Sequence, residues 1–73
     1  MEFRHDDNIE EILLRSKKKS AYIILHSGKE YYGIIKEIGL HCLVLEQTAG
    51  RDYYDAIIRI ADISSVEIQV RGL

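Results

Sequence analysis

The chain contains no proline and a single cysteine, Cys42, among its 73 residues. One cysteine cannot form an internal disulfide, and residues 1–11 lack the basic start and apolar run of a signal peptide, so we expect a cytoplasmic protein. No apolar run approaches the roughly 20 residues that a membrane-spanning helix needs, and no membrane partner is expected. Without proline, glycines must mark the turns of the chain.

What the sequence does contain is enough apolar material for a folded domain and a nearly balanced charge. Apolar residues make up 47% of the chain, too many for a disordered tail, and the formal net charge is −2. This balance argues against a protein that simply coats nucleic acid. We expect one domain over residues 1–73. A chain this short buries only about 60% of its unfolded surface, so oligomerisation is an expected source of stability.

The charges near the N-terminus are unevenly distributed. Acidic residues dominate residues 1–11, whereas the bases Arg15, Lys17 and Lys18 lie in a segment without acids. One interpretation is a helix whose charges lie at the ends that its macrodipole favours. A second interpretation adds a basic patch that contacts phosphate. Both interpretations are compatible with the pattern.

This N-terminal segment has the spacing of an amphipathic helix. Its apolar face would consist of Ile9, Ile12, Leu13 and Ser16. Asp6 or Asp7 is a suitable N-cap, because a carboxylate accepts hydrogen bonds from the first free amides of a helix. The pattern predicts a helix over about residues 7–18 that packs one face against the rest of the chain.

After this helix the apolar pattern changes to the alternation of β-strands. The predicted strands span about residues 20–27, 30–38, 41–47, 52–59 and 63–70. Gly33 lies within the second strand, where a glycine usually marks a bend or a close backbone approach. Only residues 60–62 separate the last two strands, which predicts a tight turn or one 3₁₀ turn.

These elements predict a mainly β fold in which an N-terminal α-helix precedes a strongly bent, five-stranded antiparallel small barrel. The fourth and fifth strands would be edge strands with apolar residues, including Ile57. Such edges invite pairing with another chain. Head-to-tail pairing that closes on itself produces a ring, so we expect the chain itself to be the first partner.

Two short motifs, one within residues 27–45 and one at residues 58–64, resemble those of the Sm-like superfamily. Ser27, Gly28 and Gly33, followed by residues 43–45, resemble the first Sm motif, with the short spacing typical of bacterial Hfq-like proteins. Residues 58–64 resemble the second motif. The resemblance implies a homo-oligomeric ring, a hexamer or heptamer, in which the fourth strand pairs with the fifth strand of the next subunit. It also implies a chaperone or scaffold for single-stranded RNA, without enzymatic activity or a cofactor.

The resemblance assigns candidate RNA-binding residues. They are Arg15, Lys17 and Lys18 on the rim, His41 and Arg59 at the pore side, and Tyr32 on the other face. The chain departs from the family at Gly39 and Leu40, where relatives carry hydrogen-bonding residues that hold a base. The alternative is therefore a ring that has lost the RNA pocket and serves as a structural or protein-interaction module.

Other chemical interpretations of individual residues are weaker. His41 is either a base-stacking ring or an ordinary turn residue, and Cys42 is expected to be a small buried residue rather than a nucleophile. His41 and Cys42 do not suffice for zinc, which needs three or four ligands. Of Tyr53 and Tyr54, one ring is expected in the core or an interface and the other on the surface. No arrangement of acid, base and nucleophile indicates an enzyme.

Overall fold

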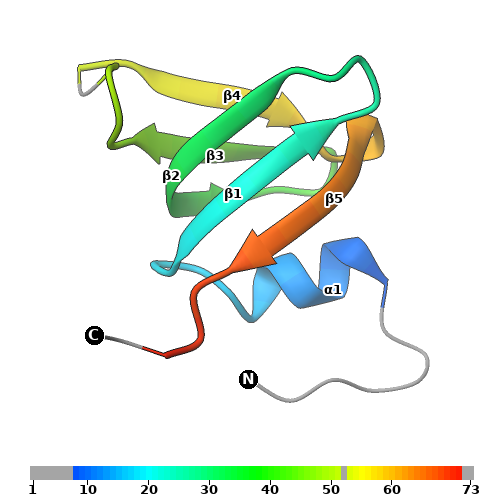
Figure 1. Cartoon of the computed structure of the whole chain (residues 1–73). Helices are drawn as coiled ribbons and strands as arrows, with labels where there is room; N and C mark the ends of the chain where they lie inside the picture. The colour runs from blue at the N-terminus through cyan, green and yellow to red at the C-terminus, as the bar shows by residue number, and fades with distance from the viewer. Residues whose placement is uncertain (1–7, 52, 72–73) are drawn as a thin grey trace.

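The computed structural model describes residues 8–51 and 53–71. Figure 1 shows a mainly β chain in which a short helix precedes the strands. Its elements are α1 (Ile9–Leu14), β1 (Ser20–Leu25), β2 (Glu30–Ile38), β3 (Cys42–Gln47), β4 (Asp55–Arg59), the 3₁₀ turn η1 (Ile60–Asp62) and β5 (Ile63–Ile68). The predicted bounds of β2 and the predicted 3₁₀ turn are confirmed. The other strands begin or end one to three residues inside their predicted limits.

The N-cap of α1 is Asn8, whose Oδ1 accepts a hydrogen bond from the Glu11 amide at 2.9 Å. The sequence prediction of Asp6 or Asp7 as the N-cap is therefore wrong, and both aspartates lie outside the described residues. Asparagine serves equally well because its side-chain oxygen satisfies an amide that has no partner within the helix.

The helix is also shorter than predicted, since it ends at Leu14 rather than near Lys18. Lys18 adopts the left-handed backbone conformation with φ 72°, which a helix cannot continue through. Its amide instead donates a hydrogen bond to the Ile35 carbonyl oxygen at 2.7 Å, and the Ile35 amide donates to the Lys19 carbonyl at 3.0 Å. Backbone bonding to β2 thus replaces the last turn of the predicted helix.

The five strands form one antiparallel sheet in the order β4-β3-β2-β1-β5. The prediction that the fourth and fifth strands occupy the edges is confirmed. In Figure 1, β3 and β4 run at a marked angle to β1 and β5. The edge strands β4 and β5 are consecutive along the chain and are joined by η1. In the sheet they lie at opposite ends, with β3, β2 and β1 between them.

Two features of β2 accompany this change of direction. Gly33 is buried, and a Cβ atom there would collide with the carbonyl oxygen of Glu46 on β3. A register shift between Ile35 and Glu37 marks a β-bulge, which locally increases strand bending and twist. Because the bulge adds a residue, Ile35 lies in the core and Ile38 packs against it, although the two are three positions apart and would point to opposite faces of a regular strand.

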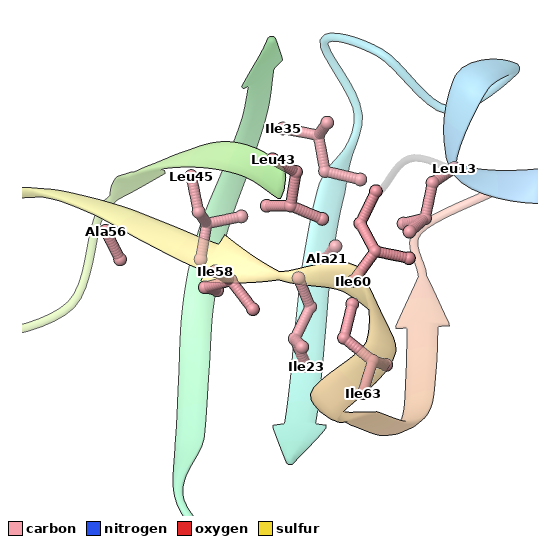
Figure 2. Close-up of a cluster of buried hydrophobic side chains, with 10 residues drawn as sticks. All are labelled: Leu13, Ala21, Ile23, Ile35, Leu43, Leu45, Ala56, Ile58, Ile60 and Ile63. Carbon is pink, nitrogen blue, oxygen red and sulfur yellow. The ribbon is translucent and has the colours of Figure 1, made fainter. Parts of the chain in front are cut away.

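Among the described residues, ten buried apolar side chains form the core, and every element contributes to it. They are Leu13, Ala21, Ile23, Ile35, Leu43, Leu45, Ala56, Ile58, Ile60 and Ile63. Figure 2 shows them gathered inside the curve of the sheet. The helix contributes Leu13. Ser16, two residues after the end of α1, is also buried, and its hydroxyl donates a hydrogen bond to the Ile12 carbonyl at 2.7 Å.

Candidate nucleic-acid interface

The predicted basic patch follows α1 and is exposed. Arg15 is the C-cap of the helix, and Lys18 lies in the turn that bonds to β2. The Lys17 Nζ lies 3.1 Å from a carboxylate oxygen of Glu37 on β2, and both side chains are accessible to water. This ion pair was not foreseen from the sequence, because it depends on how the turn folds back. It partly neutralises one of the three predicted phosphate-binding cations.

His41 and Arg59 are brought together by the pairing of β3 with β4. Cys42 at the start of β3 lies opposite Arg59 at the end of β4, so His41, the residue before β3, lies near Arg59. The His41 carbonyl accepts a hydrogen bond from the Ile60 amide at 2.8 Å, which fixes the two chain segments side by side. The predicted pore-side pair is therefore adjacent in space although it is remote in sequence.

A hollow of about 200 Å³ lies at this place, which we call the His41–Arg59 hollow. It is lined by Glu10, Leu40, His41, Arg59, Ile60 and Ala61. The lining combines an aromatic ring, a cation, a carboxylate and apolar side chains. An aromatic ring can stack on an unpaired base, and a guanidinium can bind phosphate or a base edge. Glu10 from α1 was not among the residues that the sequence pointed to.

Tyr32 lies elsewhere, on the outer face of the sheet, with 48% of its surface exposed. It is paired with Tyr22 on β1, and the two ring centroids lie 6.4 Å apart at an interplanar angle of 50°. Tyr32 also lines a second and larger hollow of about 660 Å³. We call this the tyrosine hollow. It also contains Lys29, Arg51 and Tyr54.

Two cations in the tyrosine hollow lie over aromatic rings. The Lys29 Nζ lies 5.2 Å from the centroid of the Tyr31 ring, and the Arg51 guanidinium lies 5.7 Å from that of Tyr54. Such cation–π contacts hold positive charge beside flat apolar surfaces. The sequence did not point to Lys29 and Arg51. They share a hollow with Tyr32 only once the strands have paired and the loop before β4 has folded.

The six predicted RNA-binding residues therefore occupy three places rather than one surface. The basic patch follows α1, His41 and Arg59 share their hollow, and Tyr32 belongs to the tyrosine hollow. All six side chains are exposed. The structure thus brings together one pair of the set.

The structure contradicts one sequence prediction about neighbouring residues and excludes one alternative of a second. Cys42 is exposed, not buried, because the inward positions of β3 are occupied by Leu43 and Leu45. Tyr53 and Tyr54 are 99% and 62% exposed, so neither ring enters the core of the chain. A role of one of them in an interface stays a prediction.

Among residues 8–51 and 53–71, no group of three or more histidine, cysteine or acidic side chains is placed to hold a metal ion. No helix in the described part of the chain is long and apolar enough to cross a membrane. No protein-family model and no curated protein matches the chain. The Sm-like resemblance therefore depends on the short motifs quoted above.

Proposed function

We propose that this protein is a cytoplasmic, Sm-like subunit that assembles into a homo-oligomeric ring and binds single-stranded RNA as a chaperone or scaffold. In this proposal the bent sheet is the small barrel of that fold, and the protein is not an enzyme. The observation that carries the proposal is the adjacency of His41 and Arg59, which places a stacking ring beside a cation in one hollow. The edge positions of β4 and β5 supply the surfaces for assembly.

Assembly is expected to pair β4 of one copy with β5 of the next. Unpaired backbone groups on edge strands are templates for such pairing. Ile57 supports this because it is an apolar residue on the β4 edge with 75% of its surface exposed, whereas its neighbours Ala56 and Ile58 are buried. Burial of Ile57 by a neighbouring subunit would remove this apolar surface from water.

The mass of the purified protein, measured by light scattering after gel filtration, tests the ring. The native chain is expected to elute as a hexamer or heptamer at micromolar concentration, and Ile57→Lys is expected to elute as a smaller species. Leu14→Lys places the same charge on another exposed apolar position, in α1, and is expected to leave the mass unchanged. A native protein that is monomeric under these conditions would contradict the ring.

RNA binding is expected to combine stacking and charge. The His41 ring stacks on a base, Arg59 binds the backbone or a base edge, and the bases of the rim hold phosphates. Tyr32 provides a second stacking surface on the outer face of the sheet. The three groups of residues lie at separate places, so each can be tested by its own substitution.

Fluorescence anisotropy with labelled oligo-U and oligo-A tests this binding. Micromolar or tighter affinity that weakens with salt is expected, and His41→Ala should weaken it because base–aromatic stacking contributes about 1–3 kcal/mol per base. His26→Ala is the control, since His26 is exposed in the turn after β1 and does not line the His41–Arg59 hollow. An unchanged affinity of His41→Ala would exclude the pore-side ring from binding.

The alternative function is a ring that binds a protein partner in place of RNA. An apolar groove of about 320 Å³ favours it, lined by Leu14, Ile38 and Leu40 together with Glu10 and Gly39. Leu40 and Leu14 are 84% and 60% exposed there. Absence of binding to both oligo-U and oligo-A by an intact oligomer would favour this alternative over RNA binding.

A further inference from the structure

We propose that the His41–Arg59 hollow selects guanine, because Glu10, which carries a carboxylate, lines the same hollow as His41 and Arg59. This inference rests on the proposed RNA-binding function and names the base that the site prefers. Glu10 of α1, His41 of the turn before β3 and Arg59 of β4 line one hollow of about 200 Å³. A single unstacked base is the part of RNA that such a hollow would hold.

The position of Glu10 is set by the packing of α1. Leu13 is fully buried in the core, and the cap at Asn8 fixes the first turn of the helix, so Glu10 is held beside the β3–β4 end of the sheet. Within the part of the chain that the structure describes, no side-chain hydrogen bond or ion pair occupies Glu10 or Arg59. Both groups are therefore available to a ligand in the hollow.

Hydrogen-bond chemistry decides which base fits a carboxylate. An ionised carboxylate only accepts hydrogen bonds. The Watson–Crick edge of guanine carries two adjacent donors, N1–H and the N2 amino group, which match the two oxygens of Glu10. Its O6 and N7 atoms are acceptors that suit an arginine such as Arg59.

The other bases fit this arrangement less well. Uracil has one N–H with a carbonyl acceptor on each side of it. A carboxylate that approaches this edge therefore meets at least one acceptor and is repelled. Cytosine and adenine each offer one amino donor beside a ring acceptor. A hollow with a carboxylate and a guanidinium therefore favours guanine over uracil, adenine and cytosine.

A structural role for Glu10 predicts a different result. Glu10 and Glu11 both lie in the first turn of α1, where acids are favoured by the helix dipole. Only Glu10 lines the hollow, while Glu11 is exposed on the same helix. Glu11→Gln therefore removes the same charge from the same turn without changing the hollow, and it is the matched control for Glu10→Gln.

The test measures the affinity of the intact protein for short labelled uridine oligonucleotides in which one central base is varied. Guanine at that place should bind about tenfold tighter than uracil, in line with one bidentate contact. Inosine lacks the N2 amino group, so it should lie between the two. Glu10→Gln should remove most of the preference for guanine over uracil, whereas Glu11→Gln should keep it.

Three outcomes are informative. Binding with equal affinity for all central bases overturns the guanine preference and leaves RNA binding intact. A preference that survives in Glu10→Gln overturns the assignment to this carboxylate. Absence of binding to every oligonucleotide overturns both this inference and the proposed function, so the failure of one is distinguishable from the failure of the other.

Discussion

Gly33 of β2 and Glu46 of β3 pass so close to each other that any side chain at position 33 would collide with the Glu46 carbonyl oxygen. The Cα of Gln47, which is paired with Gly33, would also lie only 3.0 Å from a Cβ at this position. Both obstacles are backbone atoms, which cannot move aside as a flexible side chain would. The absence of a side chain at Gly33 therefore permits the close approach of β2 and β3 at this point.

Gly33→Ala is expected to destabilise the fold by about 2 kcal/mol or more, since overpacking against backbone forces the strands apart. Urea unfolding followed by circular dichroism measures this change. Gly39→Ala is the control, because a Cβ there would approach only the Cys42 carbonyl, at 3.3 Å. An equal loss of unfolding free energy in the two variants would show that the close approach of β2 and β3 at Gly33 does not restrict the side chain there.

Leu13 and Leu14 are adjacent in α1 but have opposite environments, with 0% and 60% of their surfaces exposed. Leu13→Ala should lower the free energy of unfolding by about 3 kcal/mol, because it removes a buried side chain and leaves a cavity. Leu14→Ala should change it by less than about 0.5 kcal/mol. Thermal and urea unfolding of both variants measure the difference, and similar effects at the two positions would contradict the packing of α1 on the core.

The ammonium group of Lys17 forms an ion pair with Glu37, and under the proposed function an RNA phosphate would compete with Glu37 for it. If the rim binds RNA, Glu37→Gln should raise RNA affinity about threefold, as expected from the loss of an exposed ion pair. Lys17→Ala should lower the affinity and reduce the slope of log K against log salt by about 0.7. Anisotropy titrations over a range of salt concentrations measure both quantities.

Glu67 is an exposed acid on β5 that forms no ion pair among the described residues. Glu67→Gln therefore changes the net charge as Glu37→Gln does, and it is the control for net charge. A rise in affinity equal to that of Glu37→Gln would assign the effect to overall charge. A Lys17→Ala variant with an unchanged salt slope would remove Lys17 from the RNA-binding rim.

Lys36 lies at the bulge of β2, and its Nζ is 3.1 Å from the Asp55 carboxylate on β4. The hydrogen bond to Asp55 is the main cause that raises the pKa of Lys36 above the ordinary 10.5, and the attraction of the negative charge of Asp55 is the second. The pair thus stabilises the fold fully below pH 10.5, and this contribution is lost as the pH rises through the raised pKa.

Asp55→Asn should return the pKa of Lys36 toward its ordinary value, which an NMR titration of the lysine side chain measures. The stability difference between native protein and variant should be present at neutral pH and should disappear above the raised pKa. A Lys36 titration that is unaffected by Asp55→Asn would show that the ion pair does not form in solution.

Local patterns were sufficient for most of the secondary structure. The alternation from Glu30 to Ile38 predicted β2 with its observed bounds, and the three residues 60–62 predicted the 3₁₀ turn. The end of α1 was not predictable, because the alternative bonds that stop the helix at Leu14 come from Ile35, remote in sequence. Cys42 was assigned to the core from its residue type, whereas its exposure depends on which face of β3 points inward.

The sequence by itself determined the order of elements and indicated the edge strands and a bend or close approach at Gly33, because period, turn residues and glycine spacing are local properties of the chain. Only the tertiary structure decided which charged and aromatic residues meet. Strand pairing placed His41 beside Arg59, the packing of Leu13 carried Glu10 to the same hollow, and the folded turn brought Lys17 to Glu37. These contacts join residues far apart in the chain, so no local pattern records them.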